Sequence, residues 1–229
     1  MQYYVIEGID TSGKTTQCNL IKDSCSCISL SEYTDSKRNE IVLLNEPGGT
    51  ELGNLVREIL LNKQIEMAEN SAFLLFLAQR AELFMRIKDL PNKIISDRSL
   101  ISGIAYADNI DIYEALKLNL FATNGILPQK IVFLELSKEA LIERLKQKQL
   151  DNIESKGIEY LMKIQSRFKN ILQYLQTPNL LNTIKQYKES GNINADFMQL
   201  QNMQPEILML NAKLPKEELH RDICSFFGI

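Results

Sequence analysis

Gly8-Ile9-Asp10-Thr11-Ser12-Gly13-Lys14-Thr15 is the stretch that decides the fold, because it fits the pattern G-x-x-x-x-G-K-[ST] of loops that wrap a polyphosphate. The apolar run at residues 3–6 before it is typical of a buried strand. After it, Cys18, Ile21 and Cys25 recur at helical spacing. A loop between a strand and a helix N-terminus presents backbone N–H groups to an anion, so these neighbours favour a phosphate site over a chance glycine-rich turn.

Two side chains of this loop carry the chemistry that phosphoryl transfer needs. We expect Lys14 to bring a positive charge to the outer phosphates of a nucleotide and the Thr15 hydroxyl to be a ligand of Mg²⁺. The residues of this segment that we expect to contact ATP are Gly8, Ile9, Asp10, Thr11, Ser12, Gly13, Lys14, Thr15 and Thr16.

The composition is that of an ordinary globular chain and predicts one domain over residues 1–229. Hydrophobic residues make up 45% of the 229 residues, which is enough for a sizeable core. The formal net charge is -3, so there is no global positive field for nucleic acid, and any anion site must be built locally. The chain starts directly with the predicted strand and holds no apolar run of membrane-spanning length, so we expect a cytoplasmic location and no membrane partner.

The cysteines and the single histidine receive no chemical role. The cysteines lack the paired C-x-x-C spacing of a zinc site, so we interpret all of them as core thiols: Cys18, Cys25, Cys27 and Cys224. We expect His220 to lie at the surface, beside the apolar face of the last predicted helix.

Strand-like and helix-like patterns alternate along the rest of the chain, which favours a parallel sheet with helices on both faces. The predicted fold is therefore a three-layer α/β/α domain of the P-loop NTPase type. Its five predicted strands lie at residues 3–6, 40–44, 93–97, 130–134 and 206–210. The predicted helices lie at 51–61, 65–89 with a buried middle at 72–78, 101–107, 112–121, from 138 behind a Ser137 cap, and from 216.

One stretch, about residues 178–205, does not fit this alternation. It is rich in Asn and Gln and lacks a sustained apolar stripe. We interpret it as an insertion that forms a flexible excursion, a small helical appendage or a solvated surface loop.

Charged and aromatic residues follow the predicted strands at the edge where ligands bind in such sheets. The turn 46–50 follows the second strand and opens a helix that carries Arg57. Asp97 and Arg98 end the third strand, where the carboxylate is expected to hold Mg²⁺ through water and the guanidinium to face phosphates. Phe76 and Arg80 are four residues apart on one helix face, which suits a flat base with a hydrogen-bonding edge.

Each of these residues also has a plainer interpretation. Arg57 or Arg80 would pair with a surface carboxylate, Phe76 would be core, and residues 97–98 would be an ordinary ion pair. Together, however, three arginines from three segments at one edge of an acidic protein indicate more negative charge than one triphosphate brings. A second, phosphorylated substrate explains them most simply.

The order and spacing of these motifs resemble the bacterial-type thymidylate kinase family of P-loop nucleoside monophosphate kinases. The resemblance covers most of the chain and includes residues 7–17, 46–50, 75–80, 97–106 and a basic segment from Arg144. It implies transfer of a phosphoryl group from Mg-ATP to dTMP in dTTP biosynthesis, and a homodimer built through helices beside the acceptor site. It assigns the dTMP site to Asp10 at the sugar 3′-hydroxyl, Arg57 and Arg98 at the phosphate, Phe76 at the thymine face, Arg80 at the thymine edge, Tyr106 at the sugar, and Ser102. The resemblance also implies that Tyr106 disfavours a ribose 2′-hydroxyl.

The same resemblance identifies residues 144–157 as a lid that closes over the ATP phosphates. Thr11 stands where eukaryotic-type relatives have an arginine, so the charge that forms in the transition state is expected to be met from the lid, with Arg144 as the favoured donor. The expected catalytic residues are thus Lys14, Arg98 and Arg144, and Lys146 and Lys148 join the ATP-binding set. The alternative for the lid cations is a solvated helix face.

Two positions depart from the family pattern. Ala107 replaces a glutamine that the family often uses near the base, and Asn152 stands where the lid commonly has arginine, so the second lid cation is Lys146, Lys148 or absent. Two other functions remain alternatives: a P-loop kinase with another nucleotide or nucleoside acceptor, and a weakly hydrolysing ATP-binding switch or scaffold. A neutral nucleoside acceptor would leave Arg57 and Arg98 without a phosphate to bind.

Overall fold

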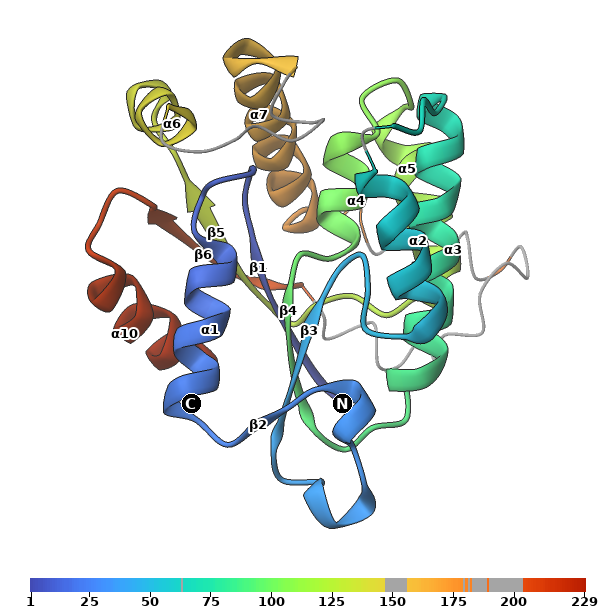
Figure 1. Cartoon of the computed structure of the whole chain (residues 1–229), viewed down its shortest axis with the longest axis vertical. Coiled ribbons are helices and arrows are strands. Elements are labelled where there is room, and N and C mark those ends of the chain that lie inside the picture. Colours follow the sequence, from blue (N-terminus) through green and yellow to red (C-terminus); the bar gives the residue numbers. More distant parts are fainter. Residues whose placement is uncertain (63, 147–155, 179, 181, 183–188, 190–203) are drawn as a thin grey trace.

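The computed structural model describes residues 1–62, 64–146, 156–178, 180, 182, 189 and 204–229. Six parallel strands of this part form one sheet in the order β2-β3-β4-β1-β5-β6 (Figure 1). The strands are β1 Gln2–Glu7, β2 Cys27–Ile28, β3 Ile41–Asn45, β4 Lys93–Asp97, β5 Lys130–Glu135 and β6 Glu206–Asn211. The five predicted strands and the fold class are confirmed. The prediction missed β2, because a two-residue strand is too short to show an alternating pattern.

The centre of the sheet is apolar on both faces. β1 lies between β4 and β5, with Val5 opposite Ser96 and Ile6 opposite Val132. Both faces of a parallel sheet are covered by helices, so its strands read as continuous hydrophobic runs. The central strand residues with no exposed surface include Val5, Ile6, Ile94, Ile95, Ile131 and Val132.

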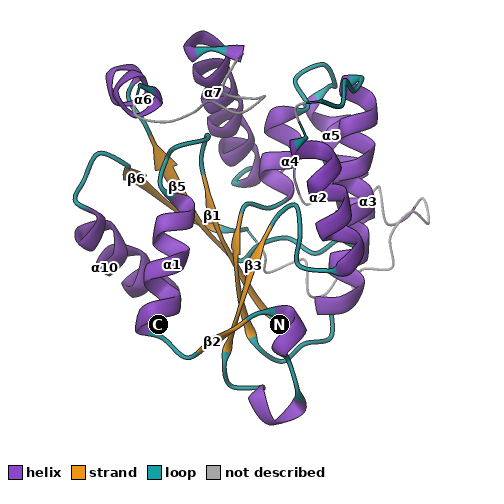
Figure 2. Cartoon of the chain, viewed as in Figure 1, coloured by secondary structure: helices purple, strands orange, loops and turns teal. Residues whose placement is uncertain are grey.

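Helices cover both faces of the sheet, as Figure 2 shows. On one side, α1 (Lys14–Ser24) packs against α10 (Lys216–Phe227). The other side carries α2 (Glu51–Leu61), α3 (Glu69–Ile87), α4 (Leu100–Tyr106), α5 (Ile112–Ala122) and α7 (Ile158–Leu175), while α6 (Lys138–Leu145) packs against α7. Two short 3-10 helices, η1 (Leu30–Glu32) and η2 (Asp35–Lys37), connect β2 to β3. Within the described ranges, no helix is long and apolar enough to cross a membrane.

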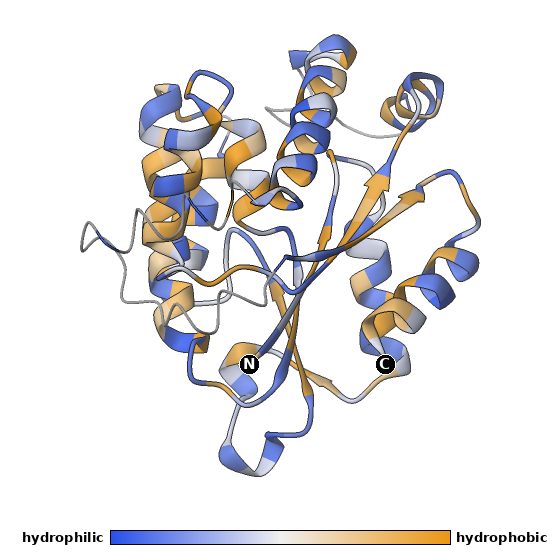
Figure 3. Ribbon diagram, turned by 180° about the vertical axis from the view of Figure 1, so that it is seen from behind, coloured by the Kyte–Doolittle hydropathy of each residue, from blue (hydrophilic) through white to orange (hydrophobic). Residues whose placement is uncertain are grey.

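Two helical predictions need correction. α7 was not among the predicted helices, although its buried residues recur at helical spacing: Leu161, Ile164, Phe168, Ile171, Leu172 and Leu175. The middle of α3 was predicted to be buried all round, but Leu74 is 60% exposed and Ala78 is exposed, whereas Phe73 and Leu77 face the core. Figure 3 shows hydrophobic residues along these helices as well as along the strands.

Several expectations concern residues at the margins of the described structure. Residues 147–155 of the expected lid at 144–157 and most of the expected insertion at 178–205 lie outside the described residues. His220 is half-buried rather than fully exposed, because it lies between Ser24 and Cys224. All four cysteines are free thiols, and burial raises the pKa of Cys27 to about 11.

Candidate functional site

The loop after β1 has a backbone shape that its glycines make possible. Gly8, Thr11 and Gly13 have φ angles of 150°, 65° and 102°. A Cβ at Gly8 would lie 2.6 Å from the Ser12 hydroxyl oxygen and 2.7 Å from the Leu134 carbonyl oxygen, so only glycine fits there. The loop leads directly into the N-terminus of α1, which confirms the predicted order of strand, loop and helix.

Lys14 lies over this loop with its charge available to an anion. Its Nζ donates hydrogen bonds to the carbonyl oxygen of Ile9 at 2.8 Å and to the hydroxyl of Ser12 at 3.4 Å, both of which are neutral. Burial, reinforced by the nearby Arg98 guanidinium, lowers the pKa of Lys14 to about 8, against the opposing effect of nearby carboxylates. A phosphate in the loop would compensate this buried cation.

Thr15 and Asp97 form a contact between α1 and the end of β4. The Thr15 hydroxyl donates to Oδ2 of Asp97 at 2.6 Å. Asp97 is 8% exposed, and its Oδ1 is a buried oxygen without a hydrogen-bond partner among the described residues. A hydroxyl beside a carboxylate with a spare oxygen is a hard oxygen donor set of the kind that Mg²⁺ takes, so these residues fit a magnesium site.

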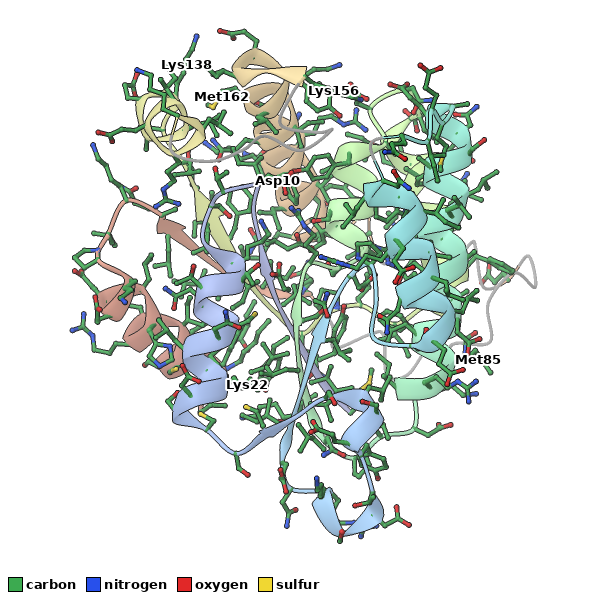
Figure 4. All side chains as sticks on the ribbon, viewed as in Figure 1. Asp10, Lys22, Met85, Lys138, Lys156 and Met162 are labelled. Carbon is green, nitrogen blue, oxygen red and sulfur yellow. The ribbon has the colours of Figure 1, made fainter. Side chains whose placement is uncertain are left out.

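Arg98, Asp10 and Tyr106 are brought together at the same edge. The Arg98 guanidinium pairs with Asp10, donates to Gly8 O at 3.3 Å and lies 5.5 Å from the centre of the Tyr106 ring. The Tyr106 hydroxyl donates to the other Asp10 oxygen at 2.7 Å. Burial opposes the charge of Arg98, but the Asp10 carboxylate raises the pKa of Arg98 above its ordinary value. Figure 4 shows Asp10 at the carboxyl end of β1, which is the edge where the sequence predicted the site.

Arg80 is the largest fully buried side chain of the described core. Its Nε donates to Glu46 at 2.7 Å, Nη1 to Asn119 at 2.5 Å and Nη2 to the Ser99 carbonyl oxygen at 3.0 Å. The carboxylate partner is therefore buried, not a surface group as the plainer interpretation supposed. Phe76 is half-buried one turn earlier on α3.

The turn between β3 and α2 ties Arg57 to the same region. Arg57 Nη1 donates to the Pro47 carbonyl oxygen at 2.7 Å, and Arg57 is half-buried. The backbone N–H of Glu46 donates to Asp97 O at 3.0 Å, so the turn lies beside the end of β4. The structure thus anchors all three predicted arginines to segments that meet at one sheet edge.

A cavity of about 400 Å³ opens on the other side of the loop, next to Arg144. Arg144, from α6, donates to the carbonyl oxygens of Thr11 at 2.6 Å and Ala212 at 2.5 Å, and burial lowers its pKa. Lys146 is exposed at the end of α6, and Lys148 lies outside the described residues. The cavity is lined by residues of the loop, α1, α6 and the β6–α10 connection: Thr11, Ser12, Gly13, Thr16, Gln17, Arg144, Ala212, Leu214, Lys216 and Leu219.

Sequence reasoning assigned no role to several buried polar residues of the site. Glu7 accepts hydrogen bonds from Ser99 and Ser102, and Asn119 and Glu46 hold Arg80. Two of these residues left a signal in the sequence. Glu7 ends an otherwise apolar strand, and Asn119 occupies a core-facing position of α5 between buried leucines.

Comparison with known proteins adds independent observations. A family model described as thymidylate kinase matches residues 6–192. A thymidylate kinase of Campylobacter jejuni subsp. doylei is 42% identical over 226 residues, which are 98% of this chain and 98% of that protein. A thymidylate kinase of Sulfurimonas denitrificans is 45% identical over 185 residues, covering 79% of this chain and 86% of that one. The crystal structure of thymidylate kinase from Ehrlichia chaffeensis matches with a TM-score of 0.63 and 22% identity over 100% of this chain and 98% of that chain, a likeness that shows the fold alone.

Proposed function

The chain belongs to the thymidylate kinase family and phosphorylates dTMP to dTDP with ATP, and from this premise we propose that the loop after β1 holds ATP while the arginines beside it hold dTMP. The observation that carries this assignment is the convergence of Lys14, Asp97 and Arg98 at the carboxyl ends of β1 and β4. This arrangement fits two phosphorylated substrates placed end to end, with Lys14 over the loop, Asp97 beside it and Arg98 toward the second substrate.

On the donor side, backbone N–H groups of the loop and the Lys14 ammonium bind the phosphates of ATP. The cavity beside Arg144 takes the nucleoside part, because it opens from the same loop and is walled by Leu214 and Leu219 as well as polar groups. Arg144 already contacts the Thr11 carbonyl oxygen, which places a guanidinium beside the position where the loop itself has no arginine. In this proposal Arg144 stabilises the charge of the transition state, and Lys146 and Lys148 assist at the lid.

Mg²⁺ is proposed at Thr15 and Asp97, with the hydroxyl as a direct ligand and the carboxylate acting through water. The unpartnered Oδ1 of Asp97 supports this assignment, since a buried carboxylate oxygen needs a partner. When bound, Mg²⁺ would neutralise negative charge on the ATP phosphates.

On the acceptor side, Arg98 and Arg57 bind the phosphate of dTMP, Phe76 lies against the base and Arg80 donates to its edge. An oxygen of the dTMP phosphate attacks the γ-phosphorus of ATP, and the bond from that phosphorus to the β–γ bridging oxygen breaks, so ADP leaves with the electron pair. No covalent enzyme intermediate is needed. Asp10 and Tyr106 face the sugar, and their mutual hydrogen bond supports a shared position there.

A second copy of the chain is proposed to cover the exposed apolar face of α2 and α3. Leu55 of α2 is 59% exposed and Leu74 of α3 is 60% exposed, and the two helices pack side by side. Leu52 and Ile59 extend this face along α2, and Met85 extends it on the outer side of α3 (Figure 4). Exposed apolar side chains on two neighbouring helices fit a self-complementary interface. Leu55→Glu should convert the dimer into a monomer in light scattering, whereas a monomeric wild type would contradict the proposal.

We further propose that residues 1–229 form one domain with a lid at 144–157, and that the enzyme works in the cytoplasm, where ATP and nucleoside monophosphates are found. The alternative acceptors and the switch or scaffold function are not favoured, since the family activity accounts for all three arginines. The defining experiment measures product formation from Mg-ATP with dTMP, dUMP, UMP, CMP, AMP and thymidine, with Lys14→Ala as the blank. Selective dTDP formation is expected, and preference for another acceptor would overturn the assignment of the base pocket.

A further inference from the structure

Glu7 is a buried carboxylate that the proposed reaction does not use. It is the last residue of β1, immediately before Gly8, and its side chain has no exposed surface. Its Oε1 accepts from the Ser99 hydroxyl at 2.6 Å and from the Ser102 backbone N–H at 3.3 Å, and its Oε2 accepts from the Ser102 hydroxyl at 2.6 Å. Burial raises the pKa of Glu7, whereas these hydrogen bonds and the charges of Arg98 and Lys14 lower it.

The direction of these hydrogen bonds determines how Arg98 is held. The Ser102 hydroxyl spends its only proton on Glu7, so its oxygen is left with lone pairs to accept from elsewhere. Arg98 Nη1 donates to that oxygen at 3.2 Å. The carboxylate thus fixes the serine as an acceptor toward the guanidinium.

The same carboxylate also reaches Arg80. Ser99, whose hydroxyl donates to Glu7, uses its carbonyl oxygen to accept from Arg80 Nη2 at 3.0 Å. The Ser99 hydroxyl oxygen in turn accepts from the Ile101 N–H at 3.1 Å, which caps the first turn of α4. One buried group therefore sets the start of α4, one contact of Arg80 and one contact of Arg98.

We propose that Glu7 is a positioning residue that orients Arg98 and Arg80 through Ser102 and Ser99, and so makes the dTMP site depend on the strand that carries the ATP loop. This inference rests on the proposed function, because it presupposes that Arg98 and Arg80 bind dTMP. Glu7 does not touch either nucleotide. Its effect is on the affinity for dTMP and on the alignment of its phosphate.

Glu7→Gln tests the proposal with almost no change of shape. A carboxylate accepts at both oxygens, whereas an amide accepts at one end and donates at the other. The Ser102 backbone N–H cannot turn away, so the amide oxygen takes the Oε1 position and the NH₂ group faces the Ser102 hydroxyl. The Ser102 proton then loses its acceptor or points at Arg98 Nη1, and either outcome displaces the guanidinium.

Steady-state kinetics of the full chain with Mg-ATP and dTMP should show the effect on one substrate only. We expect Glu7→Gln to raise the KM for dTMP about tenfold and to change the KM for ATP less than about twofold. Glu135→Gln is the matched control, because Glu135 ends the neighbouring strand β5 and pairs with Lys169 instead. It should leave both KM values unchanged. Equal changes in both KM values for Glu7→Gln would overturn the proposal.

Ser102→Ala and the double variant Glu7→Gln/Ser102→Ala separate positioning from a merely structural role. If Glu7 acts through Ser102, the KM for dTMP of the double variant should lie within about twofold of the KM of Glu7→Gln. If the two substitutions instead raise the KM for dTMP by factors that multiply in the double variant, Glu7 does not act through Ser102. If Glu7→Gln does not fold, Ser102→Ala alone must still raise the KM for dTMP, and an unchanged value would count against the proposal.

Arg98→Lys distinguishes failure of this inference from failure of the proposed function. A lysine keeps the charge but loses the fork that contacts both Ser102 and Asp10. An unchanged KM for dTMP in Arg98→Lys would remove the proposed role of Arg98 itself. A raised KM in Arg98→Lys with an unchanged KM in Glu7→Gln would reject the Glu7 inference alone.

Discussion

The proposed ATP side and the proposed dTMP side of the site are built by different means. The ATP side is a continuous loop whose shape depends on backbone geometry, with positive φ angles at Gly8, Thr11 and Gly13. The dTMP side is assembled from side chains of α2, α3 and the segment from the end of β4 into α4, and these are held by buried polar partners from β1, α5 and the turn after β3. A loop of this kind is specified locally, whereas the acceptor side requires the whole sheet edge to be in place.

This contrast predicts that the two sides can be damaged separately, and Lys14→Ala should have the largest effect. Lys14 makes its hydrogen bonds only to neutral loop oxygens among the contacts described here, so the fold loses little. Turnover should fall by roughly three orders of magnitude or more, because the charge over the outer phosphates is lost. Turnover assays with circular dichroism as the folding control test this, and activity close to wild type would contradict the donor-side mechanism.

Arg80→Lys should damage only the acceptor side. The lysine keeps a positive charge beside the buried Glu46 carboxylate, which avoids an uncompensated buried charge, but it cannot reach Asn119 and Ser99 together. We expect the KM for dTMP to rise roughly thirtyfold, with the KM for ATP nearly unchanged. A larger loss for ATP than for dTMP would exclude the role of Arg80 at the base.

Gly103→Ala sharpens the comparison, because local and long-range reasoning predict opposite results. Alanine is the better helix former by about 1 kcal/mol, so the helix alone predicts a more stable protein. In the structure, a Cβ at position 103 would lie 2.5 Å from Arg80 Nη1 and 2.8 Å from Asn119 Oδ1. We expect a lower melting temperature and a KM for dTMP raised about tenfold. A higher melting temperature with normal kinetics would show that α4 behaves as an independent helix.

The smallest predicted effect is a pH dependence on the ATP side alone. With its pKa lowered to about 8, Lys14 loses its proton as the pH rises through that value, and the neutral amine binds phosphate less well. The Kd for Mg-ATP should therefore rise about threefold between pH 7.5 and 8.5 by titration calorimetry, whereas a lysine with an ordinary pKa would give no change. Lys14→Arg stays charged over this range and should show a flat profile. A flat profile in the wild type would exclude the lowered pKa.

The sequence was sufficient to predict the fold and where most of the candidate site residues lie in it, because those depend on short patterns. Continuous apolar runs marked β1, β4 and β5, and the loop motif placed Lys14 and Thr15 at the start of α1. The carboxyl ends of parallel strands share one edge, which brought Asp97 and Arg98 to the same place without further information.

The partners of the arginines were not predictable in the same way. Asn119 is 39 positions from Arg80 and Glu7 is 95 positions from Ser102, and no local pattern links such residues. Each appears in the sequence only as a polar residue within an apolar segment. α7 is a different case, because its buried residues do recur at helical spacing and its helix was predictable from the sequence.

Arg144 joins Thr11, near the beginning of the chain, to Ala212, near its end, across the mouth of the cavity. The arginines proposed to bind dTMP, Arg57, Arg80 and Arg98, all precede residue 100, whereas the cavity wall needs Leu214 and Leu219. On a ribosome, these arginines and the loop after β1 are therefore synthesised well before β6 and α10. The cavity proposed for the nucleoside of ATP is thus the last part of the site to be completed.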